Sequence, residues 1–467
     1  MSNAEEIWAL AETKRDMFFA LSDAVWDKPE LSFAEAASCR EHTATLLREG
    51  FRVTSVAGGL PTAVVGEAGS GGPVIAFLGE YDALPLLSQA ADIAEPRVIV
   101  EGGAGHGCGH NLLGAAALMA ATAVKDYLAT RGIEGRVRYY GCPAEESGSA
   151  KGFMVRSGLF DDVDVAISWH PASFTGVNKP ISLACIEANF EFSGRAAHAS
   201  SGPELGRSAL DAVELMNVGA NYMREHMPSS ARIHYAITDS GGLAPNVVQA
   251  HAVVRYMVRA RELDTMHALF ARVRKIADGA ALMTETTARC TVIAGDANLL
   301  GNATLELVMH EALMRLGPPP FDEDDRKLAS AFQKTFTQEE INAAFTRFGL
   351  SARDLPLCDQ IYPLGGGDGS QVGSTDVGTV SWKVPTVQMR GATCAVGTPF
   401  HSWQLVAQGK STIAHKGLEH AAKGMAATAV DLLNAPELIA RAKEDWLVAR
   451  ANRPFINPIP DDVCPAI

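Results

Sequence analysis

Short apolar segments that end directly in polar, chemically active residues recur along this chain, and they most limit the folds open to it. Residues 74–78 lead into GEYD, and RVRYYG leads into CPAEE. DVAISW leads into HPASF, and PTVQMRG reaches PFHSW through a short loop. Helical stretches separate the earlier segments, as in sheets whose parallel strands are joined by crossover helices. The sequence therefore predicts an α/β fold with a central, mostly parallel sheet flanked by helices.

Helical patterns are expected at residues 4–25 and 34–49. The small-apolar run LLGAAALMAATAV, residues 112–124, is shorter than the roughly 20 residues that a membrane span requires. We interpret it as a buried helix. The N-terminal MSNAEEIWAL has no basic flank before an apolar stretch, so no secretory signal is predicted. We expect no membrane association and a cytoplasmic location.

The length of 467 residues exceeds the size at which one hydrophobic core stops growing, so two domains are expected. From about residue 186, strand and helix patterns follow one another in an α+β order, which indicates an inserted domain. The predicted division is 1–185 for the first part of the main domain, 186–296 for the insertion and 297–467 for the second part. Residues 317–374 give no clear pattern and are interpreted as a long excursion.

The net charge, the cysteines and the missing motifs disfavour several classes of function. The formal net charge of -14 disfavours nucleic acid as a partner, because a polyanion would be repelled. The eight cysteines are scattered without the spacing of a disulfide framework, which indicates reduced thiols. No GxSxG elbow and no phosphate-binding loop with its lysine occur, so serine-based catalysis and nucleotide binding are disfavoured.

The segment GHGCGHNLLG places a thiol and an imidazole two residues apart in a loop, where both can bind one metal region. Taken alone, Cys108 is equally well interpreted as a buried structural thiol and His110 as a helix-start residue. Ligands of open α/β sheets gather outside the carboxyl ends of strands, so the polar residues that follow the other strands are expected to converge there. The candidate metal ligands are Cys108, His110, Glu146, His170 and His401.

Two adjacent glutamates follow the strand RVRYYG. Neighbouring side chains in an irregular turn point different ways, so Glu146 can bind metal while Glu145 stays free. A free carboxylate can take a proton from an attacking water and hand it to a leaving amine. The ordinary alternative is a solvated acidic turn.

Five candidate ligands are more than one tetrahedral zinc ion needs, so two divalent metal ions fit better than one. Imidazole and carboxylate ligands suit zinc, manganese or cobalt, and the thiol favours zinc or cobalt. We expect zinc or manganese.

Seven motifs in order, GEYDALP, GHGCGHNLLG, CPAEE, SWHP, GRAAHAS, APNVVQ and VGTPFHSWQ, resemble the aminoacylase and carboxypeptidase superfamily of dinuclear metallohydrolases. The resemblance runs over nearly the whole chain, in the branch with auxin-conjugate and hippurate amidohydrolases. It implies a catalytic domain with an inserted lid that also dimerises. It also implies the five ligands given above, with Glu145 as the catalytic base.

The resemblance assigns further roles. It implies that His198 of GRAAHAS reaches across a dimer to stabilise the oxyanion of the tetrahedral intermediate. It implies that Asn246 and Arg259 bind substrate, with Arg259 gripping a free α-carboxylate; a surface ion pair is the alternative for that arginine. Asp82 is expected to orient a ligand without binding metal. The branch usually has an aspartate after the CGH motif, whereas this chain has Asn111. The contact that orients the His110 ring is therefore expected to differ from that of the branch.

The function that the resemblance implies is hydrolysis of the amide bond of an N-acyl amino acid, with p-aminobenzoyl-glutamate the favoured substrate. The alternatives are an amidohydrolase for an indoleacetyl or other aromatic conjugate, and a non-catalytic partner subunit. The expected assembly is a homodimer or a heterodimer with a homologous subunit.

Overall fold

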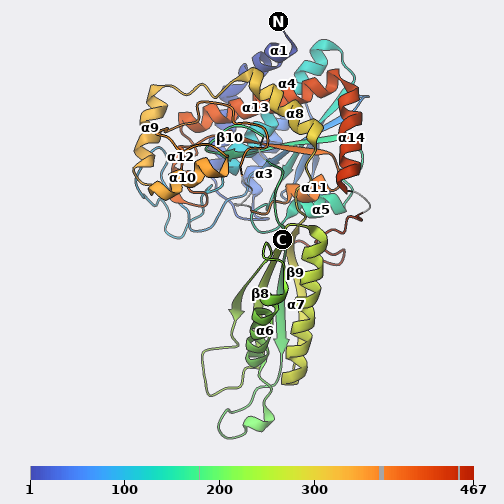
Figure 1. Ribbon diagram of the computed structural model, residues 1–467, viewed down its shortest axis with the longest axis vertical. Helices are drawn as coiled ribbons and strands as arrows, with labels where there is room; N and C mark the ends of the chain where they lie inside the picture. The colour runs from blue at the N-terminus through green and yellow to red at the C-terminus, as the bar shows by residue number, and fades with distance from the viewer. Residues whose placement is uncertain (1, 178, 368–372, 451–452) are drawn as a thin grey trace.

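Two domains with separate sheets make up the protein, as the computed structural model shows (Figure 1). The structure describes residues 2–177, 179–367, 373–450 and 453–467. The first domain is built around a six-stranded sheet and the second around a four-stranded sheet.

The six-stranded sheet has the order β1-β2-β4-β3-β5-β10. Strands β4, β3, β5 and β10 are parallel neighbours, and β2 pairs antiparallel with both β4 and β1. The predicted α/β fold with a mostly parallel sheet is thus confirmed. The strands are β1 Arg52–Ser55, β2 Val64–Ser70, β3 Val74–Glu80, β4 Gly135–Cys142, β5 Val165–Ala172 and β10 Thr386–Ala392.

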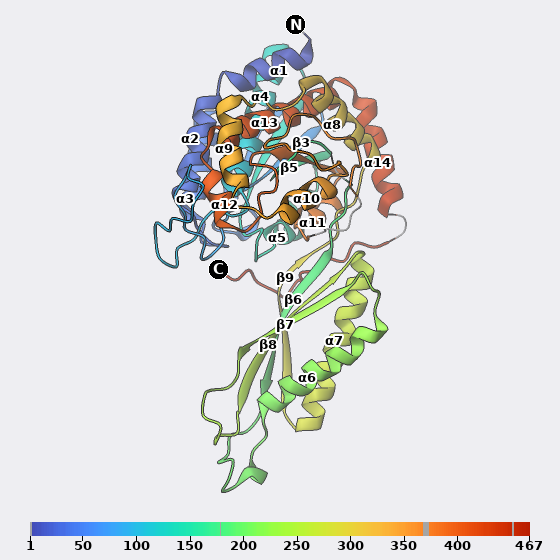
Figure 2. The ribbon, with the colours of Figure 1, turned by 60° about the vertical axis from the view of Figure 1, so that its left-hand side comes forward.

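Helices cover both faces of this sheet. One core cluster packs α4, α13 and α8 against one face, and another packs α5 and α11 against the other. Further helices surround these layers (Figures 1 and 2). The first-domain helices are α1 Asn3–Glu12, α2 Arg15–Trp26, α3 Ala36–Arg48, η1 Ala57–Gly59, α4 His110–Arg131, α5 Ala150–Arg156, α8 Ala303–Leu316, α9 Glu323–Gln333, α10 Gln338–Arg347, α11 Val377–Ser381, α12 Trp403–Gln408, α13 Thr412–Asn434 and α14 Pro436–Arg450.

The helix expected at residues 4–25 is two helices, α1 and α2, so that prediction was wrong. The Thr13 hydroxyl donates to the Leu10 carbonyl at 2.8 Å and ends the first helix. Lys14 then turns its ammonium toward Asp126 at 2.8 Å, which holds the break against α4.

Helix α4 is buried along most of its length, as expected for its small-apolar run. By length and composition alone it could cross a membrane, but 83% of its most apolar window is buried inside the protein. At Gly114, an added Cβ would lie 2.5 Å from the Glu80 carbonyl oxygen and 2.8 Å from His42 Nε2. The absence of a side chain at Gly114 therefore lets the first turns of α4 approach the end of β3.

We predict that Gly114→Ala lowers the free energy of unfolding by about 1–3 kcal/mol, because the methyl group must push α4 away from β3. Urea unfolding followed by circular dichroism measures the change. Gly279→Ala is the matched control: it is also a helix interior glycine, but its added Cβ meets nothing within 4 Å. An equal loss in both variants would contradict the close-packing explanation.

The second domain is an antiparallel sheet of order β7-β8-β6-β9, with α6 and α7 on one face (Figure 2). Its elements follow the strand and helix patterns expected there. The division at residues 186 and 296 stays a prediction; β6 and β9 are the strands that lead into and out of this domain. The bounds are β6 Ala184–Ser193, η2 Pro203–Leu205, α6 Ala209–Met223, η3 Arg224–His226, β7 Arg232–Asp239, β8 His251–Ala260, α7 Leu263–Thr284 and β9 Thr287–Asp296.

The C-terminal tail, residues 453–467, lies at the junction of the two domains (Figure 1). Arg453 pairs with Glu262 of the second domain at 2.8 Å. Farther along, Asn457 Nδ2 donates to the Gly152 carbonyl of the first domain at 2.9 Å. Arg156 donates to the Pro460 carbonyl at 2.6 Å. The tail therefore contacts both domains.

The segment interpreted as a long excursion, residues 317–374, holds α9 and α10. Both helices begin with capping boxes, at Asp322 and Thr337. Residues 368–372 of that segment lie outside the described residues.

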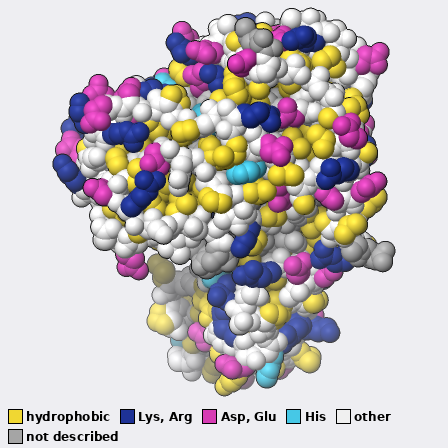
Figure 3. Space-filling view, turned by 45° about the horizontal axis from the view of Figure 1, so that its top comes forward, with side chains coloured by type: hydrophobic (Ala, Val, Ile, Leu, Met, Phe, Trp, Pro, Cys, Tyr) yellow, Lys and Arg dark blue, Asp and Glu magenta, His cyan; other side chains and the backbone are white. Residues whose placement is uncertain are grey.

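Charged side chains of both signs are interspersed over the first domain on the face that Figure 3 shows. Acidic and basic groups alternate there with apolar and uncharged ones (Figure 3). A mixed surface of this kind does not produce the extended positive field that attracts a polyanion.

Candidate metal centre

A cavity of about 600 Å³ opens beyond the carboxyl ends of β4 and β5, next to the first residues of the second domain. Side chains from both domains and from α10 line it. Among them are Cys108, Glu145, Glu146, His170 and His401.

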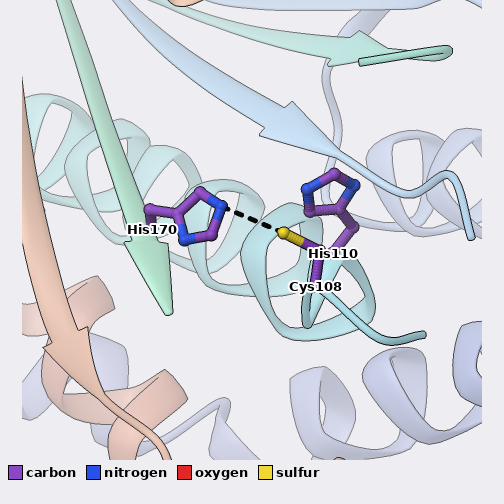
Figure 4. A group of neighbouring side chains, drawn as sticks. All are labelled: Cys108, His110 and His170. Carbon is purple, nitrogen blue, oxygen red and sulfur yellow. Dashed lines mark hydrogen bonds between the residues drawn. The ribbon is translucent and has the colours of Figure 1, made fainter. Parts of the chain in front are cut away.

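Cys108 and His170 meet beside the start of α4 (Figure 4). The Cys108 Sγ lies 3.3 Å from His170 Nε2. The Nδ1 of His170 donates to the Pro171 carbonyl at 2.8 Å, which leaves Nε2 as the lone-pair nitrogen. Burial, followed by the charge of Arg390, holds the pKa of His170 well below its usual value. A neutral imidazole and a thiol thus face one another in a geometry that a metal ion can share.

The carboxylate of Asp82, just after β3, joins two of the candidate segments. Its Oδ1 accepts from His110 Nδ1 at 2.8 Å, and its Oδ2 accepts from the backbone N–H of Glu146 at 2.9 Å. The other ring nitrogen, His110 Nε2, then lies 3.3 Å from Glu80 Oε2 and 3.9 Å from Glu146 Oε1. A carboxylate behind a histidine in this way fixes the tautomer of a metal-binding ring.

The turn that carries the two glutamates is held at its start by Glu35. Ala144 adopts a φ of 53°, and its N–H donates to Glu35 Oε1 at 2.8 Å. The Glu146 carboxylate lies close to Cys108 and His401, whereas the Glu145 carboxylate lies close to Glu80 and His110. The sequence-based interpretation of Glu145 and Glu146 as side chains with separate tasks is compatible with this geometry.

His401 approaches from the loop after β10. Its backbone adopts a φ of 56°, and its N–H donates to the Gly107 carbonyl at 2.8 Å. Its Nε2 lies 3.4 Å from Glu146 Oε1. A left-handed φ at a histidine costs free energy, and such conformations persist at functional sites when surrounding contacts enforce them.

The available donor atoms fit metal ions. Three groups have their ligand atoms within 4.8 Å of one another: Cys108, His110 and His170; Cys108, Glu146 and His401; and Glu80, His110 and Glu145. The buried atoms His110 Nε2, Glu80 Oε2 and Glu146 Oε1 have no hydrogen-bond partner among the described residues. Buried polar atoms without partners are costly, and cations bound to these donor groups would provide such partners.

A buried ion network lies directly behind this cluster. The ammonium of Lys151 on α5, fully buried, donates to Glu80 Oε1 and to Asp376 Oδ1, each at 2.7 Å. The network leaves Glu80 Oε2 free at 3.3 Å from His110 Nε2. Glu80 is therefore held in place next to the candidate ligands by a cation that cannot reach solvent.

Glu145 is half-buried in the cavity wall. Burial first, and then the negative charges of Glu80 and Glu146, raise its pKa well above the usual value for a glutamate. A carboxylate with such a raised proton affinity suits a group that must accept and release a proton.

The remaining predicted site residues divide into two groups. Arg259, on β8 opposite Cys185 of β6, lines the cavity. His198 and Asn246 lie in the loops at the opposite end of the second domain, joined by the bridge between His198 and Val247, and they do not line the cavity of their own chain (Figure 1). The His198 ring accepts the N–H of Ser200 at 3.2 Å.

Asn111, which stands where the resembling branch has an aspartate, does not support His110. Its Nδ2 donates to Ser22 Oγ at 3.0 Å and to the Gly409 carbonyl at 3.1 Å, so it ties α4 to neighbouring segments. Asp82 makes the contact with the His110 ring instead.

Sequence reasoning missed four charged residues around the centre: Glu80, Lys151, Arg347 and Arg390. Glu80 had a visible signal, since it ends a buried strand two residues before Asp82. Lys151 had none, because its partners come from residues 71 and 225 positions away. Arg347 belongs to the segment that gave no clear pattern.

A cavity at the carboxyl ends of parallel strands, lined by a thiol, imidazoles and carboxylates that can hold metal ions, defines a metal-dependent hydrolase. The chain belongs to peptidase family M20/M25/M40, whose sequence pattern matches residues 76–352. It is accordingly a metal-dependent amidohydrolase.

Relatives with known names support this assignment. The chain is 46% identical to the B-type subunit of the p-aminobenzoyl-glutamate hydrolase of Escherichia coli, over 97% of both chains. It is 28% identical to the human Xaa-Arg dipeptidase, over 94% of this chain and 91% of that protein. It is 29% identical to the A-type subunit of the same Escherichia coli hydrolase, over 46% of this chain and 51% of that relative.

Solved structures share the fold. A dinuclear metal-binding peptidase of the M20 family from Bacillus subtilis matches with a TM-score of 0.56 and 19% identity, over 91% of this chain and 99% of its own. The aminobenzoyl-glutamate utilization protein of Klebsiella pneumoniae matches with a TM-score of 0.59 and 16% identity, over 89% and 96%.

We predict that Asp82→Asn weakens metal binding by about 10- to 100-fold, because an amide cannot accept from both the His110 ring and the Glu146 N–H. Calorimetric titration of the metal-stripped protein with zinc measures the affinity. Asp16→Asn serves as control, since that carboxylate is 95% exposed. An unchanged zinc affinity in Asp82→Asn would show that Asp82 does not orient the metal-binding residues.

Proposed function

We propose that the chain hydrolyses the amide bond of p-aminobenzoyl-glutamate, giving p-aminobenzoate and glutamate. The observation that carries the proposal is that Cys108, Glu146, His170 and His401 line one cavity together with Glu145, and that the His110 ring lies close to Cys108 and His170. The substrate is proposed from the relative that is 46% identical over nearly the full length.

Two divalent ions, zinc or manganese, are proposed to be held by these five residues. Two of the three donor groups share Cys108, which supports neighbouring rather than separate sites. When bound, such ions polarise a carbonyl and make a water molecule more acidic.

Glu145 is proposed as the group that moves the proton. Its raised pKa favours retention of a proton taken from the attacking water until the leaving nitrogen receives it. Asp82, held by His110 and by the Glu146 N–H, keeps the neighbouring side chains oriented while this occurs.

The aromatic acyl group has a candidate contact in the cavity wall. Phe400 lies with its ring centroid 5.8 Å from that of His170, and Phe348 lines the same cavity from the end of α10. Aromatic side chains of this kind stack on an aryl group and add to its binding.

A dimer through the second domain is proposed, either with a second copy or with a homologous subunit. β7 is the first strand in its sheet, and Tyr235 and Ile237 on it are 38% and 46% exposed. On α6, Val218 and Tyr222 are 50% and 74% exposed. An edge strand with exposed apolar neighbours is a surface that a partner covers. Such a partner would supply His198 and Asn246 to the cavity of the other chain.

The test is release of p-aminobenzoate from p-aminobenzoyl-glutamate by purified protein that has been chelated and reloaded with zinc or manganese. We expect metal-dependent release in the wild type. Glu145→Gln is expected to lower kcat by about 10²- to 10⁴-fold, because it removes the proton acceptor, while metal content stays unchanged. Glu101→Gln, an exposed glutamate outside the cavity, is the matched control.

Release from an indoleacetyl or other aromatic conjugate alone would overturn the substrate and keep the chemistry. Absence of release from every acyl amino acid, with metal bound, would favour a partner subunit that lacks activity by itself. Full activity of Glu145→Gln would remove that residue from the mechanism.

A further inference from the structure

Two guanidinium groups line the cavity beside the metal-binding residues. Arg390 lies on β10 directly opposite His170 of β5, and paired residues of parallel strands project to the same side of a sheet. Arg347 is the last residue of α10 and shares its cavity-facing side with Glu340, Ala343 and Ala344, at the spacing of one helical face. Both arginines are therefore directed to the space next to the candidate ligands.

Neither guanidinium has an ion pair or a hydrogen bond with any residue that the structure describes. Most other arginines of the first domain do have one, such as Arg138 with Asp162 at 2.7 Å. Burial, followed by the positive charge of Arg347, lowers the pKa of Arg390 to about 10. Two like charges held close together in a partly buried place are unfavourable unless an anion joins them.

Tyr362 lies next to Arg390, because its ring packs against Gly176, which pairs with Arg390, but it does not line the cavity. The side chain is fully buried, and its Oη has no hydrogen-bond partner among the described residues. Burial raises the pKa of Tyr362, and the charges of Arg390 and Arg347 act in the opposite direction. The backbone of Arg390 is fixed there by a pair of hydrogen bonds with Gly176, of 2.8 and 3.0 Å.

Three acidic side chains of the cavity do not pair with either guanidinium. Glu340 accepts from the Thr337 N–H at 2.7 Å at the start of α10. Glu187 lies 3.5 Å from Arg255, and Asp296 has a pKa raised to about 7 by burial and by the charge of Asp376. Within the part of the chain that the structure describes, both guanidiniums therefore keep unused donors, and Glu145 acts on Arg390 through its charge alone.

We propose that Arg347 and Arg390 form a carboxylate clamp for the acidic side chain of the amino acid that is released. The inference rests on the proposed function, since it names which N-acyl amino acids that site prefers. Every N-acyl amino acid has an α-carboxylate, for which Arg259 is the expected partner, at the edge of the cavity that β8 forms. A second cationic site on the α10 side is what a second carboxylate needs. The side-chain carboxylate of a glutamate conjugate can bind to this cationic site, whereas the side-chain guanidinium of an arginine conjugate would be repelled by it.

The experiment compares two substrates of equal shape, p-aminobenzoyl-glutamate and p-aminobenzoyl-glutamine, which differ only in the charge of the side-chain end. We expect wild-type kcat/KM to favour the glutamate conjugate by about tenfold or more, as for a charge-assisted contact. Arg347→Gln and Arg390→Gln are each expected to lower kcat/KM for that conjugate by about 10- to 100-fold and to leave the glutamine conjugate within about twofold. Arg347→Lys should restore part of the preference. Arg48→Gln, an exposed arginine of α3 outside the cavity, should change neither.

A second measurement does not depend on turnover. Calorimetric titration of the metal-loaded protein with glutamate and with glutamine reports product binding. We expect glutamate to bind more tightly than glutamine, and this difference to disappear in Arg347→Gln. If the wild type shows the difference but releases no p-aminobenzoate, the clamp stands and the proposed function fails.

Three results would overturn the clamp. The first is an equal loss with both substrates in the arginine variants, which would indicate a general effect on the site. The second is an unchanged preference for glutamate in both variants. The third is the absence of any difference between glutamate and glutamine in binding to the wild type.

Discussion

The carboxylate of Asp82 is the contact on which the geometry of the centre depends. It comes from the end of β3, and its two oxygens hold the His110 ring and the Glu146 N–H, which belong to the start of α4 and to the loop after β4. One buried group thereby sets the positions of two segments that are far apart along the chain. It can do so only because α4 approaches β3 closely at Gly114 and because Lys151 offsets the negative charge of neighbouring Glu80.

Much of the fold and of the candidate ligand set could be predicted from the sequence, for a physical reason. Parallel strands buried on both faces are apolar throughout, so residues 74–78 and 165–169 stand out, and the polar residues after them must lie at one edge of the sheet. β1 and β2 were not assigned, because β1 is four residues long and mostly exposed and β2 is interrupted by glycines. The break between α1 and α2 was missed because it depends on Lys14 meeting Asp126, a contact made only in the folded chain.

The residues that prediction missed share one property: they act through charges that pair, or fail to pair, in three dimensions. Lys151 in AKGFM has the pattern of any surface lysine, yet it is fully buried between two carboxylates. Arg347 ends a helix whose other cavity-facing residues include two alanines, and nothing in that pattern indicates a cavity. In contrast, His198 and Asn246 were noticed through motifs, and they lie in loops at the outer end of the second domain, outside the lining of the cavity.

The junction of the domains has a mechanical consequence. Strands β6 and β9 pair from Cys185 with Asp296 to Ser193 with Thr287, so both chain crossings run side by side as one ribbon. The C-terminal tail adds a third connection off that axis, with Arg453 bound to Glu262 on one side and Asn457 bound to Gly152 on the other. A rotation of the second domain about these two crossings would stretch this connection, so the contacts of the tail oppose such a rotation.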